Sequence, residues 1–407
     1  MSDVARRGRP ARARPGPPPR PRRLPLTAAG ETTTEFLLLT ATAAVLLVLG
    51  LVMTFSASFV HSAGESGDAF GIFQRQLLWC AIGLPPMVLA ASVDYRLWRR
   101  MSGPALAVTL LAVALVLVPS IGHEVNGARR WLDLGPLRFQ PTEVLKLTLP
   151  LYLAHVLDSR WARLRRGDIA ALLSPAVPLI ALAAGLVVLE PDLETALLVA
   201  LIGGLVLYTA GLPGRLIAVG VAGGAALVAA GVAARGFRQG RLLAWLDPMA
   251  YPTTFGYQSL QGFMALGSGG WFGVGLGQGR GKWLFLPNPH TDFIFAIIGE
   301  ELGLLGAMFV LALFAALAVG GLRTARRAPD PFGRLLATAI TGWLVLQAGI
   351  NIGSVVGLMP VTGVTLPLVS FGGSSLLFTL LGMGILLSIA RAGRPVADDV
   401  GSDSEQQ

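Results

Sequence analysis

The sequence has few of the residues that a water-soluble enzyme normally uses for folding and catalysis. Only 14% of its 407 residues are charged and its mean hydropathy is +0.65, whereas soluble domains carry about 25% charged residues. The single cysteine, Cys80, lies within an apolar run, which excludes a disulfide framework and a cysteine-based metal site. Four scattered histidines argue equally against a histidine-rich metal centre. The composition therefore excludes a set of soluble domains and favours the bilayer as the main solvent.

Long apolar stretches are what the sequence has instead. A transmembrane helix needs roughly 20 mostly apolar residues. The stretches that reach or approach this length are residues 36–58, 72–93, 104–120, 141–157, 169–189, 195–212, 215–233, 292–321, 335–358 and 374–391. We therefore predict an all-α integral membrane protein with about ten transmembrane helices. A large extracytoplasmic loop, residues 234–291, is predicted between helices 7 and 8.

Arginine-rich segments set the predicted orientation, because basic loops resist translocation across the membrane. These residues sit in short runs between apolar stretches, unlike the basic face of a soluble nucleic-acid-binding fold. Residues 1–34 are rich in Arg and Pro, and the loops of matching parity carry Arg96, Arg99, Arg100, Arg160, Arg163, Arg165, Arg166, Arg323, Arg326, Arg327 and Arg334. Both termini are thus predicted to be cytoplasmic. Residues 35–393 form the membrane domain, while residues 1–34 and the acidic residues 394–407 are expected to lack structure.

Basic residues also occur where the same rule disfavours them, in two loops predicted to face outward. They are Arg129, Arg130 and Arg138 after the third span, and Arg235, Arg238, Arg241, Arg280 and Lys282 within residues 234–291. Such residues indicate an anionic ligand at the outer face, for which a lipid diphosphate is a candidate. Snorkelling of the side chains to lipid headgroups explains any single one of them equally well.

Ionisable residues inside membrane spans are costly, and they usually face a cavity or one another. Glu143 and Lys146 stand three residues apart near the outer end of the fourth span, on one helical face and within pairing distance. Either they line a functional cavity or they form an ion pair that only joins helices. Glu300 and Glu301 lie within the eighth span, where one of them is expected to bond a neighbouring helix.

Two outer loops have compositions that suit a cover over a cavity. Residues 267–281 are rich in Gly but lack the flanking strand and the Gly-Lys-Ser/Thr of a nucleotide loop, so a re-entrant or folded flap is the better interpretation. Asp292 is expected to begin the eighth helix, where the helix dipole would stabilise its ionised form and a plain N-cap role is the alternative. Asn and Gly residues within 351–357 interrupt the ninth span, which is tolerated only beside protein or a water-filled cavity.

Six motifs along the chain form a recognisable set. They are Asn126-Gly-Ala-Arg-Arg-Trp131, Phe139-Gln-Pro-Thr-Glu-Val-Leu-Lys146, Glu190-Pro-Asp192, Gly256-Tyr-Gln258, Leu286-Pro-Asn-Pro-His-Thr-Asp-Phe-Ile-Phe295 with Gly299-Glu-Glu-Leu-Gly303, and residues 360–375. In this order they resemble the SEDS family (shape, elongation, division and sporulation), the peptidoglycan polymerases typified by FtsW and RodA. The resemblance runs from the first span to the tenth, and residues 296–301 are more similar to FtsW than to RodA.

The resemblance implies a peptidoglycan glycosyltransferase in the cytoplasmic membrane of a bacterium, acting in cell division or elongation. Such an enzyme polymerises lipid II, the undecaprenyl-diphosphate disaccharide-peptide, in an outward-facing cavity. The implied partners are a class B penicillin-binding protein and other division or elongation membrane proteins, and no nucleic acid. By the family's pattern Asp292 is the catalytic carboxylate, while Glu143 and Lys146 line the same cavity.

Sugar transfer needs a carboxylate for the acceptor hydroxyl and positive charge for the leaving diphosphate. Asp292 supplies the first, alone or as the ligand of a divalent cation (Mg or Mn), although no cofactor is firmly indicated. The substrate-binding candidates are Glu143, Lys146, Arg129, Arg130, Gln258, Lys282 and Ser370. The chain departs from the family's pattern at Glu194, Gly279, Thr142 and Phe371, where Gly, Ser, Ser and Tyr are usual.

Two other functions stay open on the sequence alone. A lipid II flippase or secondary transporter would also have ten spans and interrupted helices, but it should show inverted repeats, which the sequence lacks. A non-catalytic membrane scaffold of the division machinery would explain the topology, yet it gives Asp292 no role.

Overall fold

The computed structural model describes residues 33–66, 68–125, 128–135, 137–233, 236–283, 286–287 and 289–393. The tails expected to lack structure, residues 1–34 and 394–407, lie outside this part of the chain apart from Thr33 and Thr34. Asn126, Arg235 and the side chain of Arg238 also lie outside it.

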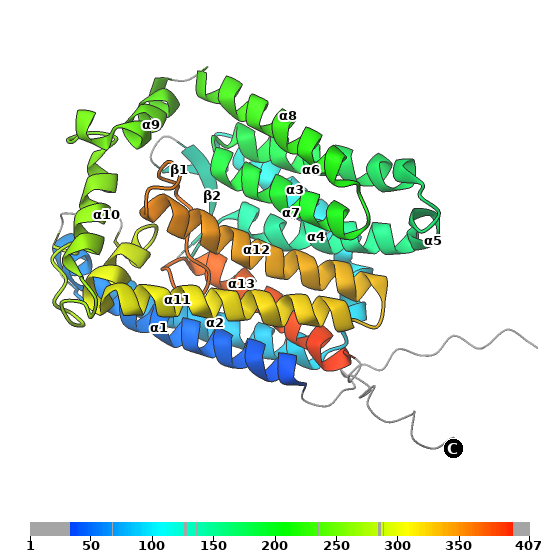
Figure 1. The fold of residues 1–407 in the computed structure, drawn as a ribbon, viewed down its shortest axis with the longest axis horizontal. Helices are drawn as coiled ribbons and strands as arrows, with labels where there is room; N and C mark the ends of the chain where they lie inside the picture. Colours follow the sequence, from blue (N-terminus) through cyan, green and yellow to red (C-terminus); the bar gives the residue numbers. More distant parts are fainter. Residues whose placement is uncertain are drawn as a thin grey trace, which may run out of the picture.

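Within the described residues, ten helices match the ten predicted apolar stretches and run side by side (Figure 1). They are α1 (Thr34–Ser66), α2 (Gly71–Ser92), α3 (Trp98–Val116), α4 (Pro141–Ser159), α6 (Ile169–Leu189), α7 (Leu193–Thr209), α8 (Gly214–Ala233), α11 (Ile294–Arg327), α12 (Pro331–Val355) and α13 (Gly373–Ala392). Six helices of the described chain are long and apolar enough to cross a membrane, namely α1, α3 with the preceding η1 (Tyr95–Leu97), α6, α11, α12 and α13. The prediction of a helical, multi-pass membrane protein is confirmed.

A small antiparallel sheet after α3 departs from the all-α prediction. Its strands are β1 (Gly122–Val125), β2 (Ala128–Leu134) and β3 (Leu137–Phe139), with β2 in the centre. Leu132 of β2 faces Gly122 on one side and Phe139 on the other. Strands β1 and β3 contain four and three residues, too few to display a clear alternating pattern, so the sheet could not be predicted from the sequence.

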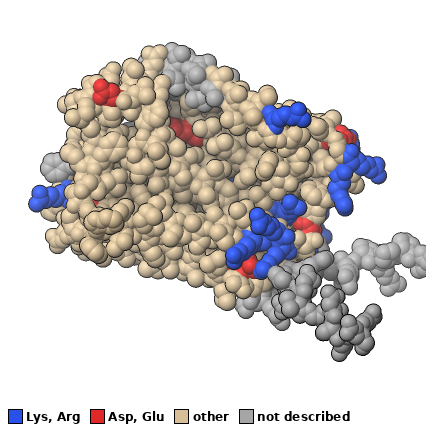
Figure 2. Space-filling view, in the orientation of Figure 1, with Lys and Arg blue, Asp and Glu red and all other residues tan. Residues whose placement is uncertain are grey.

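The two ends of the helix bundle differ in their connections and their charge. One end holds the start of α1, the end of α13, α5 (Trp161–Leu164) and the α11–α12 turn (Figure 1). Figure 2 shows Lys and Arg side chains gathered toward this end, beside a broad face that carries almost no charge. The other end holds the sheet, α9 (Gly236–Leu246), η2 (Pro248–Ala250) and α10 (Tyr257–Ser268). This distribution agrees with the predicted orientation, since basic residues collect on the cytoplasmic side.

Helix α11 is broken at Gly303, and the Gly-rich loop pairs with the broken turn. Gly303 has φ 70° and ψ −169°, a conformation that side chains other than hydrogen strongly disfavour. The N–H groups of Val274 and Gly275 donate to the carbonyls of Glu300 and Glu301 at 3.0 and 3.1 Å. In return, the N–H groups of Leu304 and Leu305 donate to the carbonyls of residues 270 and 271 at 2.9 and 3.2 Å. The expected flap thus satisfies backbone groups that a break in a membrane helix would otherwise leave unpaired.

Candidate active site

Asp292 lies in a short non-helical segment whose backbone is held at three successive carbonyls. The carbonyl of His290 accepts a hydrogen bond from the N–H of Phe371 at 2.9 Å. The carbonyl of Thr291 accepts from Ser370 Oγ at 2.7 Å, and that of Asp292 accepts from Asn351 Nδ2 at 2.8 Å. Helix α12 runs unbroken through Asn351 and ends at Val355, so the predicted interruption lies only at its end. Asn351 of this helix and the loop after it position the candidate carboxylate.

The N-cap interpretation of Asp292 is wrong. Helix α11 begins at Ile294 and its N-cap residue is Phe293, which makes no side-chain capping bond. The carboxylate of Asp292 is half-buried and accepts no hydrogen bond from any described residue. Burial raises its pKa to about 7; Glu194 also raises it, while Arg241 and Arg130 lower it. The expected stabilisation of the ionised form by a helix dipole is thus reversed, and Asp292 is poised to exchange a proton near neutral pH.

Arg130 holds the Glu190-Pro-Asp192 turn against the sheet. Its guanidinium donates to the carbonyls of Glu190 and Pro191 and lies 3.5 Å from Asp192 Oδ2. Asp192 in turn caps α7 by accepting the N–H of Thr195 at 3.1 Å. Strand β2 therefore delivers Arg130 to the start of α7, from where its charge reaches Asp292. Its neighbour Arg129 turns instead to Glu124 of β1, with an ion pair of 3.1 Å.

Glu190 is a buried carboxyl that sequence reasoning did not single out as a functional group. Its side chain is fully buried, and neither oxygen has a hydrogen-bond partner among the described residues. Burial, together with the charge of Asp192, raises its pKa to about 8 against the opposing effect of Arg130. Glu190 is therefore mostly protonated at neutral pH.

Glu143 and Lys146 form a close ion pair inside the bundle. Lys146 Nζ lies 2.7 Å from Glu143 Oε2 and donates to Gln347 Oε1 at 2.9 Å, with only 2% of Lys146 exposed. Gln347 also accepts from Trp343 Nε1 at 2.7 Å and donates to the carbonyl of Thr365 at 2.9 Å. The pair thus joins α4 to α12 and to the last outer loop, which gives weight to the helix-joining alternative.

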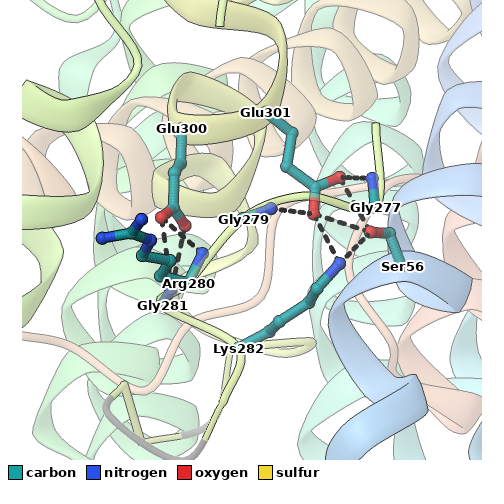
Figure 3. Close-up of polar contacts among 8 residues, drawn as sticks. All are labelled: Ser56, Gly277, Gly279, Arg280, Gly281, Lys282, Glu300 and Glu301. Carbon is teal, nitrogen blue, oxygen red and sulfur yellow. Dashed lines mark hydrogen bonds and ion pairs between the residues drawn. The ribbon is translucent and has the colours of Figure 1, made fainter. Parts of the chain in front are cut away.

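Lys282 belongs to a second buried cluster, around the two glutamates of α11. Lys282 Nζ lies 2.9 Å from Glu301 Oε1 and donates to Ser56 Oγ of α1 at 3.1 Å. Figure 3 shows Ser56 and Lys282 converging on the carboxylate of Glu301, while Glu300 accepts the N–H groups of Arg280 and Gly281. The expectation that one of these glutamates bonds a neighbouring helix is confirmed. Lys282 is placed to hold the Gly-rich loop on α11.

Ser370 and Gln258, two other substrate-binding candidates, both donate to backbone carbonyls of the segment that leads to Asp292. Ser370 is buried and also accepts the N–H of Leu366 at 2.8 Å, so its hydroxyl ties two stretches of backbone together. Gln258 lies on α10 and donates to the carbonyl of Pro287 at 3.3 Å. Among the described residues, no three His, Cys, Asp or Glu side chains gather in a metal-binding group.

Glu194 and Arg241 complete the surroundings of Asp292. They form an ion pair of 3.3 Å between the first turn of α7 and α9, and the charges of both act on the pKa of Asp292. The sequence marked Glu194 only as a departure from the family's pattern and Arg241 only as one of several outward basic residues. The two residues are close because α9 lies against the start of α7, and this position of α9 cannot be predicted from hydropathy.

Comparisons with known proteins agree on one family. The model of the cell cycle proteins FtsW, RodA and SpoVE matches residues 36–394. A probable peptidoglycan glycosyltransferase FtsW of Mycobacterium tuberculosis H37Rv is 43% identical over 364 residues, covering 89% of this chain and 69% of that protein.

Solved structures agree with this assignment. A chain from a structure titled "Structural coordination of polymerization and crosslinking by a peptidoglycan synthase complex" is 34% identical, with a TM-score of 0.71 over 87% of this chain and 96% of that one. The rod shape determining protein RodA of Thermus thermophilus is 33% identical, with a TM-score of 0.63 over 87% and 95% of the two chains.

Proposed function

This chain belongs to the FtsW, RodA and SpoVE family of cell cycle proteins, the SEDS family, and from that premise we propose that it is a peptidoglycan glycosyltransferase. It polymerises lipid II into glycan strands at the outer face of the bacterial cytoplasmic membrane. The relatives named as probable glycosyltransferases at 43% identity support this activity. Their FtsW names favour a role in division over one in elongation.

All ten long helices are proposed to span the membrane, with both termini in the cytoplasm. Support comes from the basic end of the bundle, where the start of α1 and the end of α13 lie together (Figures 1 and 2). Asp292, the sheet and α9 then face outward, where a lipid-linked sugar presents its diphosphate.

In the proposed reaction Asp292 acts on the acceptor sugar. Its carboxylate takes the proton of the acceptor 4-hydroxyl as that oxygen forms a bond to the anomeric carbon of the donor, and polyprenyl diphosphate leaves with the electrons of the broken C–O bond. A pKa of about 7 suits a base that must be partly ionised yet able to hold the proton. The observation that carries the proposal is a carboxylate without a hydrogen-bond partner among the described residues, on a backbone held at three successive carbonyls.

Three roles are proposed for five of the other candidates. Arg130 contributes positive charge at Asp292, while Ser370, Gln258 and Lys282 position the surrounding backbone. Arg129, at the sheet, remains a candidate for contact with the substrate.

A divalent cation would rest on Asp292 and on the substrate's own diphosphate, because Mg²⁺ commonly uses one or two carboxylates with substrate phosphates. Within the part of the chain that the structure describes, no group of three or more His, Cys, Asp or Glu side chains is placed to hold a metal ion. The mechanism above therefore assigns the cation no step.

A class B penicillin-binding protein is the proposed partner, since the similar chain comes from a peptidoglycan synthase complex whose title joins polymerisation with crosslinking.

Polymerisation of lipid II by the purified protein with such a partner tests the function. We expect glycan strands from the native protein and none from Asp292→Asn, with equal membrane accumulation and partner binding. Lipid II movement across liposomes without polymer would support a flippase instead. Neither activity, with intact partner binding, would support a scaffold.

A further inference from the structure

Helix α9 is linked to the bundle by two side chains on one of its faces. Arg241 and Trp245 stand four residues apart, which places them above one another on a helix. Arg241 pairs with Glu194 at the start of α7 at 3.3 Å, and Trp245 Nε1 donates to the carbonyl of Gly357, just after α12, at 3.0 Å. Helix α9 thus connects the start of α7 with the loop after α12, while Asn351 of α12 donates to the backbone carbonyl of Asp292.

The ion pair of α9 is more exposed than the buried ion pair of α4. The side chains of Arg241 and Glu194 are 40% and 24% exposed, whereas those of Lys146 and Glu143 are 2% and 9% exposed. Exchanging a partner is costly for a buried pair and easy for a solvated one, because water replaces the lost contact. Arg130 is already bound to three groups of the 190–192 turn. The Arg241–Glu194 pair is therefore easier to exchange than the Lys146–Glu143 pair.

Charge balance gives Glu194 a role in that exchange. Arg241 and Glu194 both act on Asp292, with opposite signs, so the pair places little net charge beside it. A diphosphate arriving at Asp292 carries negative charge and needs a cation, and Glu194 is then its competitor for Arg241.

We propose that Glu194 is a positioning residue that holds Arg241 beside Asp292 and yields it to the diphosphate of the lipid-linked substrate, so that α9 is latched between turnovers. The proposal rests on the function proposed above, because it takes a polyprenyl diphosphate as the ligand. Glu194 is one of the residues at which the chain departs from the family's pattern.

Two variants that remove the same ion pair separate a latch from a structural pair. Binding of undecaprenyl diphosphate to the purified full-length protein in detergent is measured for Glu194→Gln and Arg241→Gln. If Glu194 competes with the ligand, Glu194→Gln tightens binding about two- to fivefold, the range that a partly exposed ion pair supports. Arg241→Gln weakens binding at least as much. A merely structural pair predicts weaker binding in both variants, which would overturn the proposal.

Glu194→Asp is the second variant, in case Glu194→Gln folds poorly. The shorter side chain loosens the pair but keeps the charge, so it should tighten binding less than Glu194→Gln; weaker binding than in the native protein would contradict the latch. Asp168→Asn is the matched control, because it removes a 3.0 Å ion pair with Arg163 at the other end of the bundle and should leave binding unchanged. Inorganic diphosphate is tested as a competitor, to separate recognition of the charged group from recognition of the lipid.

Polymerisation assays on the same proteins distinguish failure of the latch from failure of the function. With the latch, Glu194→Gln lowers the KM for lipid II by the factor found in binding. An active native protein whose KM is unchanged by Glu194→Gln defeats the latch alone. An inactive native protein together with its partner defeats the proposed glycosyltransferase, while the binding measurements still decide the latch.

Discussion

Replacing Asp292 with Asn should stabilise the protein while abolishing polymerisation. Burial raises the pKa of Asp292 from 3.8 to about 7, so the folded state holds the proton more tightly than the unfolded chain does. The native protein therefore loses stability as the pH rises from about 4 toward 7. A shift of about three pKa units corresponds to at most about 4 kcal/mol, and the partial exposure of the side chain reduces that figure. Asparagine has no such proton to lose.

The measurement is the free energy of unfolding of both proteins in mixed micelles at pH 5, 6, 7 and 8. We expect the advantage of Asp292→Asn to grow by up to about 1.4 kcal/mol per pH unit between pH 5 and 7 and then to level off. Asp168→Asn serves as the control, because the pH dependence of its effect on stability should have the opposite sign. The N–H of Ala171 and the Arg163 side chain lower the pKa of Asp168, so its contribution to stability is present at neutral pH and lost as the pH falls. Parallel pH profiles for native protein and Asp292→Asn would refute the argument that Asp292 is destabilised by burial.

Three further predictions concern Asn351 and two buried groups, the Glu143–Lys146 ion pair and Glu190. Asn351→Ala removes the donor to the carbonyls of Asp292 and Val364, so kcat should fall by about 10- to 100-fold with a smaller change in KM. A rise in KM of that size with kcat unchanged would contradict a positioning role. Lys146→Met leaves Glu143 buried without its cation and should cost about 3–5 kcal/mol in denaturation, whereas Lys146→Met with Glu143→Leu should recover most of that stability. Glu190→Gln imitates the protonated carboxyl, which is the main form at pH 6.5 because the pKa of Glu190 is about 8. The rate of polymerisation at pH 6.5 should therefore change less than twofold. A large loss of activity would show that the ionised form is needed.

The helices could be predicted from the sequence because hydropathy is a local property. The ten apolar stretches correspond to ten helices, with errors of up to eight residues at their ends. The sheet could not be predicted, since its strands are short and its pairing joins β1 and β3 to opposite edges of β2. That sheet carries Arg130 to the 190–192 turn, so a contact at the site depended on an element without a sequence signal.

The pairings within the site were equally out of reach. Asp292 was identified by its motif, but its raised pKa comes from burial, and burial is set by segments far away in the chain. Lys282 was identified as a basic residue of an outer loop, whereas its partners are Glu301 of α11 and Ser56 of α1. Glu143 and Lys146 were paired correctly because they stand on one helical face, which is again a local property.

The broken turn of α11 also constrains how the chain can be inserted into the membrane during synthesis. Residues 270–275, which complete the hydrogen bonding at the break, leave the ribosome before Gly303 does, and in the proposed orientation they are already outside when α11 enters the translocon. The inner segment of α11, from Leu304 to Arg327, can form as an ordinary helix at once. The outer turn can finish only when the earlier loop folds back onto it. Completion of this helix therefore has to follow the folding of the Gly-rich loop onto its broken turn.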